Sequence, residues 1–212
     1  MSNIVVILIH GYNVSDPRNT VGKFRREVEK FGHTAELYSY GYWPFPWQIT
    51  KRNPKFAREI AGRIRYWKGK GYRVYLIAHS NGNTIARICE KVHKQYADRI
   101  LAIHPALRKT MEISEFAEKV YVVHNKGDKA VVAGKVLGWF TKVLSMDSWR
   151  FRPWGDMGQD GYNGGRVNHF NIDTGSNKLP PMLRCHGHSE EFHENVAHYW
   201  LPYLTDKLLG RK

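Results

Sequence analysis

Five short apolar runs, each followed by small or polar residues, constrain the fold of this chain more than any other feature. The strongest runs are continuous rather than alternating, which is typical of strands that are buried on both faces in a parallel sheet. They are Ile4–Ile9, Ala35–Tyr38, Val74–Ala78, Ile100–Ile103 and Val120–Val123, with a weaker run at Val167–Ile172. The runs therefore predict a sheet of about six strands.

Amphipathic helices are predicted between these runs. Apolar residues recur there at spacings of three and four, in stripes that begin at Val21, Ala57, Ile85, Val136 and Phe192. The second helix is expected to begin just after Pro54. Alternating strands and helices favour a doubly wound, mostly parallel α/β sheet with helices on both faces. In such sheets, functional sites lie at the C-terminal ends of the strands.

The length of 212 residues predicts a single domain that spans residues 1–212. Two segments interrupt the alternation of strands and helices. One is an aromatic loop at about 38–54, which contains Tyr42 and Trp43, and the other is a Gly/Trp-rich loop at about 145–166. Long loops of this kind commonly carry function. Both are therefore interpreted as an active-site rim, with a small satellite core as the alternative.

Charge and cysteine content bear on location and partners. No apolar run reaches the ~20 residues needed to span a bilayer, and two widely separated cysteines indicate reduced thiols. These features predict a cytoplasmic protein. The net charge of +14 is compatible with weak electrostatic binding to polyanions or with an ordinary solvated basic surface. The chain contains no recognised nucleic-acid-binding motif.

The strongest local motif is Ala78-His79-Ser80-Asn81-Gly82, which lies between an apolar run and a helical stripe. It resembles the G-x-S-x-G turn, in which a serine is exposed on a sharp strand-to-helix bend. Small residues are needed there because strand and helix approach closely. We predict that Ser80 is the nucleophile. The backbone amide of Asn81, at the helix N-terminus, is expected to stabilise an oxyanion.

A second motif, His10-Gly11-Tyr12-Asn13, directly follows the first apolar run. Together with the serine turn, it resembles the α/β-hydrolase superfamily, and in particular its serine esterase and lipase-like branch. The resemblance runs from Ile4 to about Leu208. It implies that the Tyr12 amide forms the other half of an oxyanion hole, and that the fold is a minimal one without a large cap.

The acid and the base are predicted from positions later in the chain. Asp128 follows Gly127 just after the fifth run, and the order serine, acid, histidine is the one expected for this fold. The resemblance favours His188, in a Gly-His-Ser loop before the last helix, as the base. His186 remains the alternative base.

Other polar residues near these motifs are pocket candidates: His10, Gly11, Asn13, His79, His104, Tyr42 and Trp43. No cofactor is expected. A metal site built on His186, His188 and His193 is disfavoured because the His-Glu-x-x-His spacing is absent.

The predicted function is a serine hydrolase that cleaves a carboxylic ester or thioester through an acyl-enzyme intermediate. The alternative is a basic binding protein on a hydrolase scaffold, directed to nucleic acid or anionic surfaces.

Overall fold

The computed structural model describes residues 3–43, 46–130 and 155–210. Its centre is a six-stranded sheet in the order β2-β1-β3-β4-β5-β6, and all neighbouring strands are parallel. The strands are β1 (Ile4–Ile9), β2 (Thr34–Tyr38), β3 (Arg73–His79), β4 (Arg99–Ile103), β5 (Lys119–His124) and β6 (His169–Asp173). The predicted six-strand α/β sheet is confirmed, and each apolar run corresponds to one strand.

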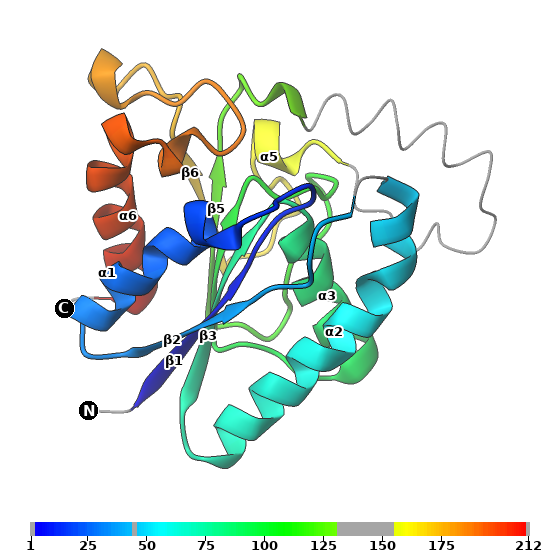
Figure 1. Cartoon of the computed structure of the whole chain (residues 1–212). Coiled ribbons are helices and arrows are strands. Elements are labelled where there is room, and N and C mark those ends of the chain that lie inside the picture. Colours follow the sequence, from blue (N-terminus) through cyan, green and yellow to red (C-terminus); the bar gives the residue numbers. More distant parts are fainter. Residues whose placement is uncertain (1–2, 44–45, 131–154, 211–212) are drawn as a thin grey trace.

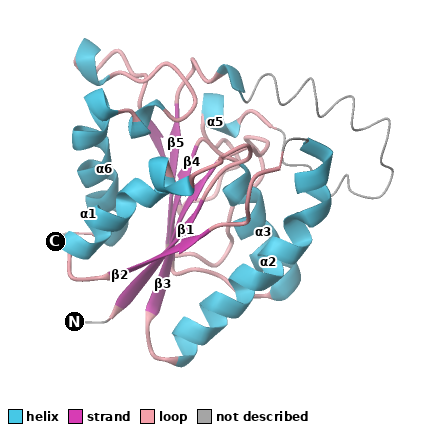
Figure 2. Ribbon diagram, viewed as in Figure 1, coloured by secondary structure: helices cyan, strands magenta, loops and turns pink. Residues whose placement is uncertain are grey.

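Helices cover both faces of this sheet (Figures 1 and 2). The longer helices are α1 (Phe24–Lys30), α2 (Pro46–Gly69), α3 (Asn81–His93) and α6 (Glu194–Leu209), and α5 (Met157–Asp160) is a single turn. Helices α2 and α3 pack together on one face, while α1 and α6 lie together on the other. The described helices thus agree with the doubly wound arrangement expected from the sequence.

The continuous apolar strands follow from this layering. In β1, Val5, Ile7 and Ile9 belong to the core beneath α2 and α3. Ile4, Val6 and Leu8 point to the opposite face and pack with residues of α1 and α6. Because successive side chains of a strand point to opposite faces, a sheet covered on both sides requires apolar residues at every position.

Helix α2 begins at Pro46, earlier than the predicted start after Pro54. The second half of the aromatic segment at about 38–54 is therefore helical. Proline inside a helix removes a hydrogen bond, but the preceding turn buries Ile49 and Asn53 completely, which favours continuation of the helix. The predicted helix at Val136 and residues 145–154 of the second loop lie outside the described residues.

Cys89 and Cys185 are buried free thiols, as the sequence indicated. Burial raises the pKa of the Cys89 thiol to about 12.

Within the described part of the chain, every helix is too short or too polar to cross a bilayer.

Candidate active site

Ser80 occupies a sharp bend between β3 and α3. Its backbone has φ 52° and ψ −118°, a conformation that disfavours residues other than glycine. The bend lies against the end of β1. A Cβ on Gly82 would lie 2.7 Å from the carbonyl oxygen of Ile9 and 2.9 Å from that of His10. The strained serine and the obligatory glycine two residues later match the turn predicted from the sequence.

The turn after β1 runs directly beside Ser80. A Cβ on Gly11 would lie 2.9 Å from the Cβ of Ser80 and 2.7 Å from Nδ1 of His79. The next residue is Tyr12, and Asn13 has a positive φ of 59°. On the other side, Asn81 is the first residue of α3, where backbone amides lack acceptors within the helix. Two chain segments that can present amides therefore flank the same serine.

Asp128 and His188 are joined by a hydrogen bond. Nδ1 of His188 lies 2.8 Å from Oδ2 of Asp128. Asp128 follows β5 and is fully buried, whereas the His188 side chain is 19% exposed. Their loops approach closely, because a Cβ on Gly127 would overlap the carbonyl oxygen of His186. Glycine at 127 is therefore needed to let the two loops meet.

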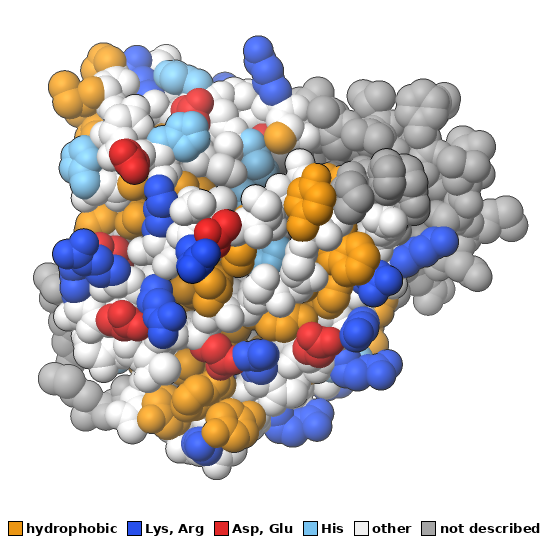
Figure 3. Space-filling view, viewed as in Figure 1, with side chains coloured by type: hydrophobic (Ala, Val, Ile, Leu, Met, Phe, Trp, Pro, Cys, Tyr) orange, Lys and Arg blue, Asp and Glu red, His pale blue; other side chains and the backbone are white. Residues whose placement is uncertain are grey.

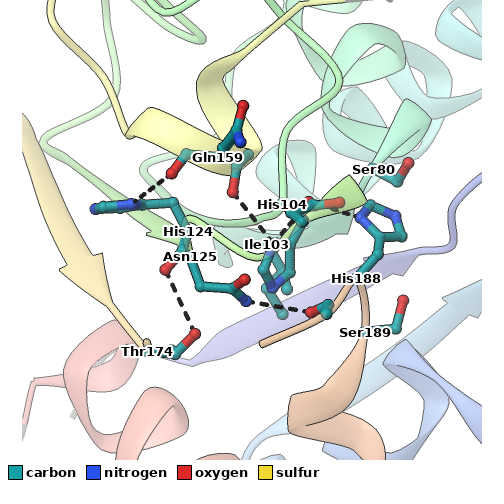
Figure 4. A network of polar contacts seen from close by, with 12 residues as sticks. Ser80, Ile103, His104, His124, Asn125, Gln159, Thr174, His188 and Ser189 are labelled. Carbon is teal, nitrogen blue, oxygen red and sulfur yellow. Dashed lines mark hydrogen bonds and ion pairs between the residues drawn. The ribbon is translucent and has the colours of Figure 1, made fainter. Parts of the chain in front are cut away.

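A second histidine contacts the same aspartate. Nδ1 of His104, at the end of β4, lies 3.0 Å from Oδ2 of Asp128. Nε2 of His104 lies 3.0 Å from the carboxylate of Glu191, which also accepts a hydrogen bond from Thr174 at 2.6 Å. His104, Asp128, Thr174 and Glu191 are all fully buried. Figure 4 shows the surroundings of His104 and His188.

The charges of this cluster follow from its contacts. Burial opposes the protonation of His104, but Glu191 and Asp128 outweigh it and raise the His104 pKa to about 10. Burial likewise opposes ionisation of Asp128, yet hydrogen bonds from His104 and His188 hold its pKa well below the usual range. His104 is therefore an imidazolium between two carboxylates.

His79 is buried beside Ser80 and contacts the loop that carries His188. Its Nε2 lies 2.9 Å from Oγ of Ser189, and its ring centroid lies 4.7 Å from that of His188. Burial is the main reason that its pKa falls well below the ordinary value, so the imidazole is neutral. His79 thus supports the loop that carries His188 without adding charge.

A buried polar network supports the turn after β1. Nε2 of His10 accepts a hydrogen bond from the Tyr40 amide at 3.1 Å, and the Tyr40 hydroxyl donates to the His10 carbonyl at 3.0 Å. The side-chain amides of Asn53 and Asn81 exchange two hydrogen bonds of 3.0 Å. The side-chain amide of Asn81 also donates a hydrogen bond to the Tyr40 hydroxyl at 3.4 Å. The network therefore links both segments that flank Ser80.

Sequence reasoning missed Tyr40, Asn53, Thr174 and Glu191 as parts of the site. One signal was available for Asn53, a polar residue four positions after Ile49 on the buried face of α2. Tyr40, Thr174 and Glu191 carry no local signal that would place them near Asp128 or Ser80.

The remaining pocket candidates lie at different depths. His10, His79 and His104 are buried, with at most 2% exposed. Tyr42 is 53% exposed. Trp43 donates its indole N–H to the Tyr40 carbonyl at 2.9 Å, and the Arg52 guanidinium lies 4.0 Å from its ring centroid. Trp43 is partly buried and packs against the core.

His186, the alternative base, is exposed, and its backbone amide donates to Glu190. Among the described residues, no hydrogen bond joins Ser80 Oγ to His188 Nε2. Such contacts often tighten only when substrate binds.

One cluster of the described residues has a spacing that could suit a metal ion: His104, Asp128 and His188. It differs from the cluster of His186, His188 and His193 that was weighed from the sequence. Its atoms are 2.8 and 3.0 Å apart as hydrogen-bonded donor and acceptor pairs. A metal would require neutral imidazoles, whereas the flanking carboxylates keep His104 protonated. The donor set therefore fits a proton-linked network better than a metal centre.

Comparisons with solved structures identify the fold. A hydrolase of the alpha/beta superfamily from Xanthomonas campestris pv. campestris is 16% identical, with a TM-score of 0.52 over 96% of this chain and 99% of that chain. A serine hydrolase without a lid from Xanthomonas campestris is 13% identical, with a TM-score of 0.56 over 100% and 86%. Est1E from Butyrivibrio proteoclasticus, solved with ferulic acid, is 12% identical, with a TM-score of 0.58 over 99% and 91%.

No protein-family profile matches the chain, and no curated protein matches it in sequence. At these low identities, the structural likeness establishes the fold alone, which is that of the α/β hydrolases.

Proposed function

We propose that this protein is a serine hydrolase that cleaves a carboxylic ester or thioester through an acyl-enzyme intermediate. The observation that carries the proposal is the 2.8 Å hydrogen bond between Asp128 and His188 at the sheet edge where Ser80 occupies a strained bend. The fold adds support because similar structures, at low identity, are described as hydrolases. In this proposal, Ser80 is the nucleophile, His188 the base and Asp128 the acid.

The first half-reaction uses the tautomer of His188 that Asp128 favours. A carboxylate that accepts a hydrogen bond from Nδ1 leaves Nε2 without a proton. Nε2 removes the proton of the Ser80 hydroxyl as Oγ forms a bond to the ester carbonyl carbon. The amides of Tyr12 and Asn81 stabilise the developing oxyanion. The bond to the alcohol or thiol then breaks, and the leaving group takes the proton from His188.

The second half-reaction is hydrolysis of the acyl-enzyme. A water molecule loses a proton to Nε2 of His188 and attacks the same carbonyl carbon. The Ser80 oxygen leaves and recovers its proton from His188. Both half-reactions need a carboxylate at Asp128, since it stabilises the imidazolium formed each time.

The exposed Tyr42 and the partly buried Trp43 suit an apolar acyl or aromatic group, because their rings supply a large contact area. They follow β2, at the sheet edge where the other site residues lie. A panel of p-nitrophenyl esters of increasing chain length would define the acyl preference.

The test combines covalent labelling with ester hydrolysis. A fluorophosphonate probe should label Ser80, as mapped by mass spectrometry, and Ser80→Ala should abolish labelling. Asp128→Asn and His188→Gln should each lower kcat for p-nitrophenyl butyrate by about 10³–10⁴-fold, because the base loses its proper tautomer or is removed. Circular dichroism would check that each variant is folded.

Two histidine variants serve as controls. His198 is exposed on α6, so His198→Gln should behave as the unmodified protein. His186→Gln separates the two candidate bases and should keep nearly full activity if His188 is the base. Full esterase activity in Ser80→Ala, or loss of activity in His186→Gln but not in His188→Gln, would contradict the proposed roles.

We also propose that the positive charge gives weak binding to polyanions. Helix α2 contains seven Lys or Arg residues and one acidic residue, Glu59, and Lys51, Lys55 and Arg58 are exposed. Basic side chains are numerous on the side of the molecule where α2 lies (Figure 3). Elution from heparin should require less salt after Lys51, Lys55 and Arg58 are changed to Gln. An unchanged elution position would contradict this role.

A further inference from the structure

We propose that His104 and Glu191 form a charged positioning unit behind Asp128, which sets the proton affinity of His188. This inference rests on the proposed function and deepens it, because it adds two residues that contact no substrate. Four groups form a continuous chain: Glu191, His104, Asp128 and His188.

The geometry gives Asp128 two imidazole partners on one oxygen. Oδ2 lies 2.8 Å from Nδ1 of His188 and 3.0 Å from Nδ1 of His104. The His104 ring is locked in turn, because its Nε2 lies 3.0 Å from both oxygens of Glu191. Thr174 donates to Glu191 and fixes that carboxylate. The orientation of Asp128 is therefore fixed by His104 and, through it, by Glu191, which are themselves fully buried.

Because this hydrogen-bonded chain of side chains is buried, its charges interact strongly with one another. Asp128, His104 and Glu191 are inaccessible to solvent, so their mutual interactions are weakly screened. Two carboxylates and one imidazolium leave a net charge of −1 behind His188. Removing the positive charge would make protonation of His188 easier. Removing the charge of Glu191 would make it harder as long as Asp128, which still contacts His104, keeps His104 protonated.

Other titratable groups face this chain without changing its balance. His79 packs against both imidazoles, and its pKa is lowered mainly by burial. His124 interacts with His104, and its pKa is lowered mainly by burial as well. In both groups, burial favours the neutral imidazole. Cys185 contacts Glu191, and burial raises the pKa of its thiol. Glu190, in the loop that carries His188, accepts a hydrogen bond from the His186 amide. The buried charges behind His188 are those of Asp128, His104 and Glu191.

The size of the effect follows from distance. The ring centroids of His104 and His188 are 5.3 Å apart. At an effective dielectric constant of about 20, one charge at this separation shifts a titration by roughly two pH units. Glu191 lies on the far side of His104, so its charge should shift the titration by roughly one pH unit or less.

The experiment measures the pH dependence of kcat/KM for p-nitrophenyl butyrate and of fluorophosphonate labelling. The acidic limb of each profile reports protonation of the base. Glu191→Gln should move this limb to lower pH and His104→Gln should move it to higher pH. The double variant should lie between the two single variants. A merely structural role would lower rates without opposite shifts.

A control variant and a second route to the measurement complete the experiment. Glu194→Gln removes an exposed carboxylate of α6 and should leave the limb in place. If His104→Gln fails to fold, Glu191→Gln and the double variant still carry the test. The inference is overturned if Ser80→Ala is inactive but the limb is unmoved in Glu191→Gln and in every folded His104 variant. Activity that survives Ser80→Ala instead refutes the proposed function itself.

Discussion

Replacing Ser80 by glycine should abolish activity and, relative to alanine, increase stability. The comparison with Ser80→Ala matters because both changes remove the hydroxyl, so the two variants differ mainly in how they tolerate the backbone. Ser80 has φ 52° and ψ −118°, a region in which a residue with a Cβ is strained and glycine is not. The protein therefore holds Ser80 in this bend at a cost in stability.

The magnitude follows from two opposing effects. A residue held in such a conformation costs about 1–3 kcal/mol, and glycine relieves this strain. Glycine also loses more chain entropy on folding, which offsets about 0.5–1 kcal/mol. Ser80→Gly should therefore be more stable than Ser80→Ala by up to about 2.5 kcal/mol, with a central value of about 1 kcal/mol. For a protein of this size, the central value corresponds to about 2–4 °C in Tm.

Urea unfolding followed by circular dichroism would measure the difference, with thermal unfolding as a second measurement. Lys94 provides a control, because it is exposed at the end of α3 with φ 55° and ψ 31°. Lys94→Gly should be about 1 kcal/mol more stable than Lys94→Ala. The reasoning would be refuted if glycine stabilised the protein at position 94 but not at position 80.

Two other predictions concern the turn after β1. Gly82→Ala should destabilise the protein by about 1–3 kcal/mol and lower kcat about 10²-fold, because the new Cβ would lie 2.7 Å from the Ile9 carbonyl oxygen. Gly62→Ala is the control, because a Cβ there would have nothing within 4 Å, and it should change neither stability nor kcat. Equal effects of the two substitutions would argue against the packing explanation. Burial lowers the pKa of His10 to about 4, so the unfolded chain binds a proton below about pH 6.5 while the folded protein does not. The His10 contribution to the free energy of unfolding should therefore fall by up to about 3 kcal/mol from pH 7 to pH 4. Burial also lowers the pKa of His169 to about 4, so urea titrations of His10→Gln should show a weaker pH dependence rather than none. An unchanged dependence would exclude a contribution from His10.

Much of the fold could be predicted from local patterns. Continuous apolar runs indicate strands buried on both faces, and small residues around Ser80 indicate a bend where a strand and a helix approach. Both patterns reflect the conformation and burial of neighbouring residues, so they are legible without knowledge of distant contacts. The start of α2 was predicted wrongly, because Pro54 was taken as a boundary although burial of Ile49 and Asn53 outweighs its lost hydrogen bond.

The tertiary structure decided which residues surround Asp128. His104, Asp128 and Glu191 come from the ends of β4, β5 and the loop before α6, so no sequence spacing indicates that they meet. The same is true of Asn53 and Asn81, whose paired amides join α2 to α3. Local chemistry specifies where each polar residue stands in its own element. Only the packing of parallel strands brings these elements together, and burial among them then determines which groups are charged.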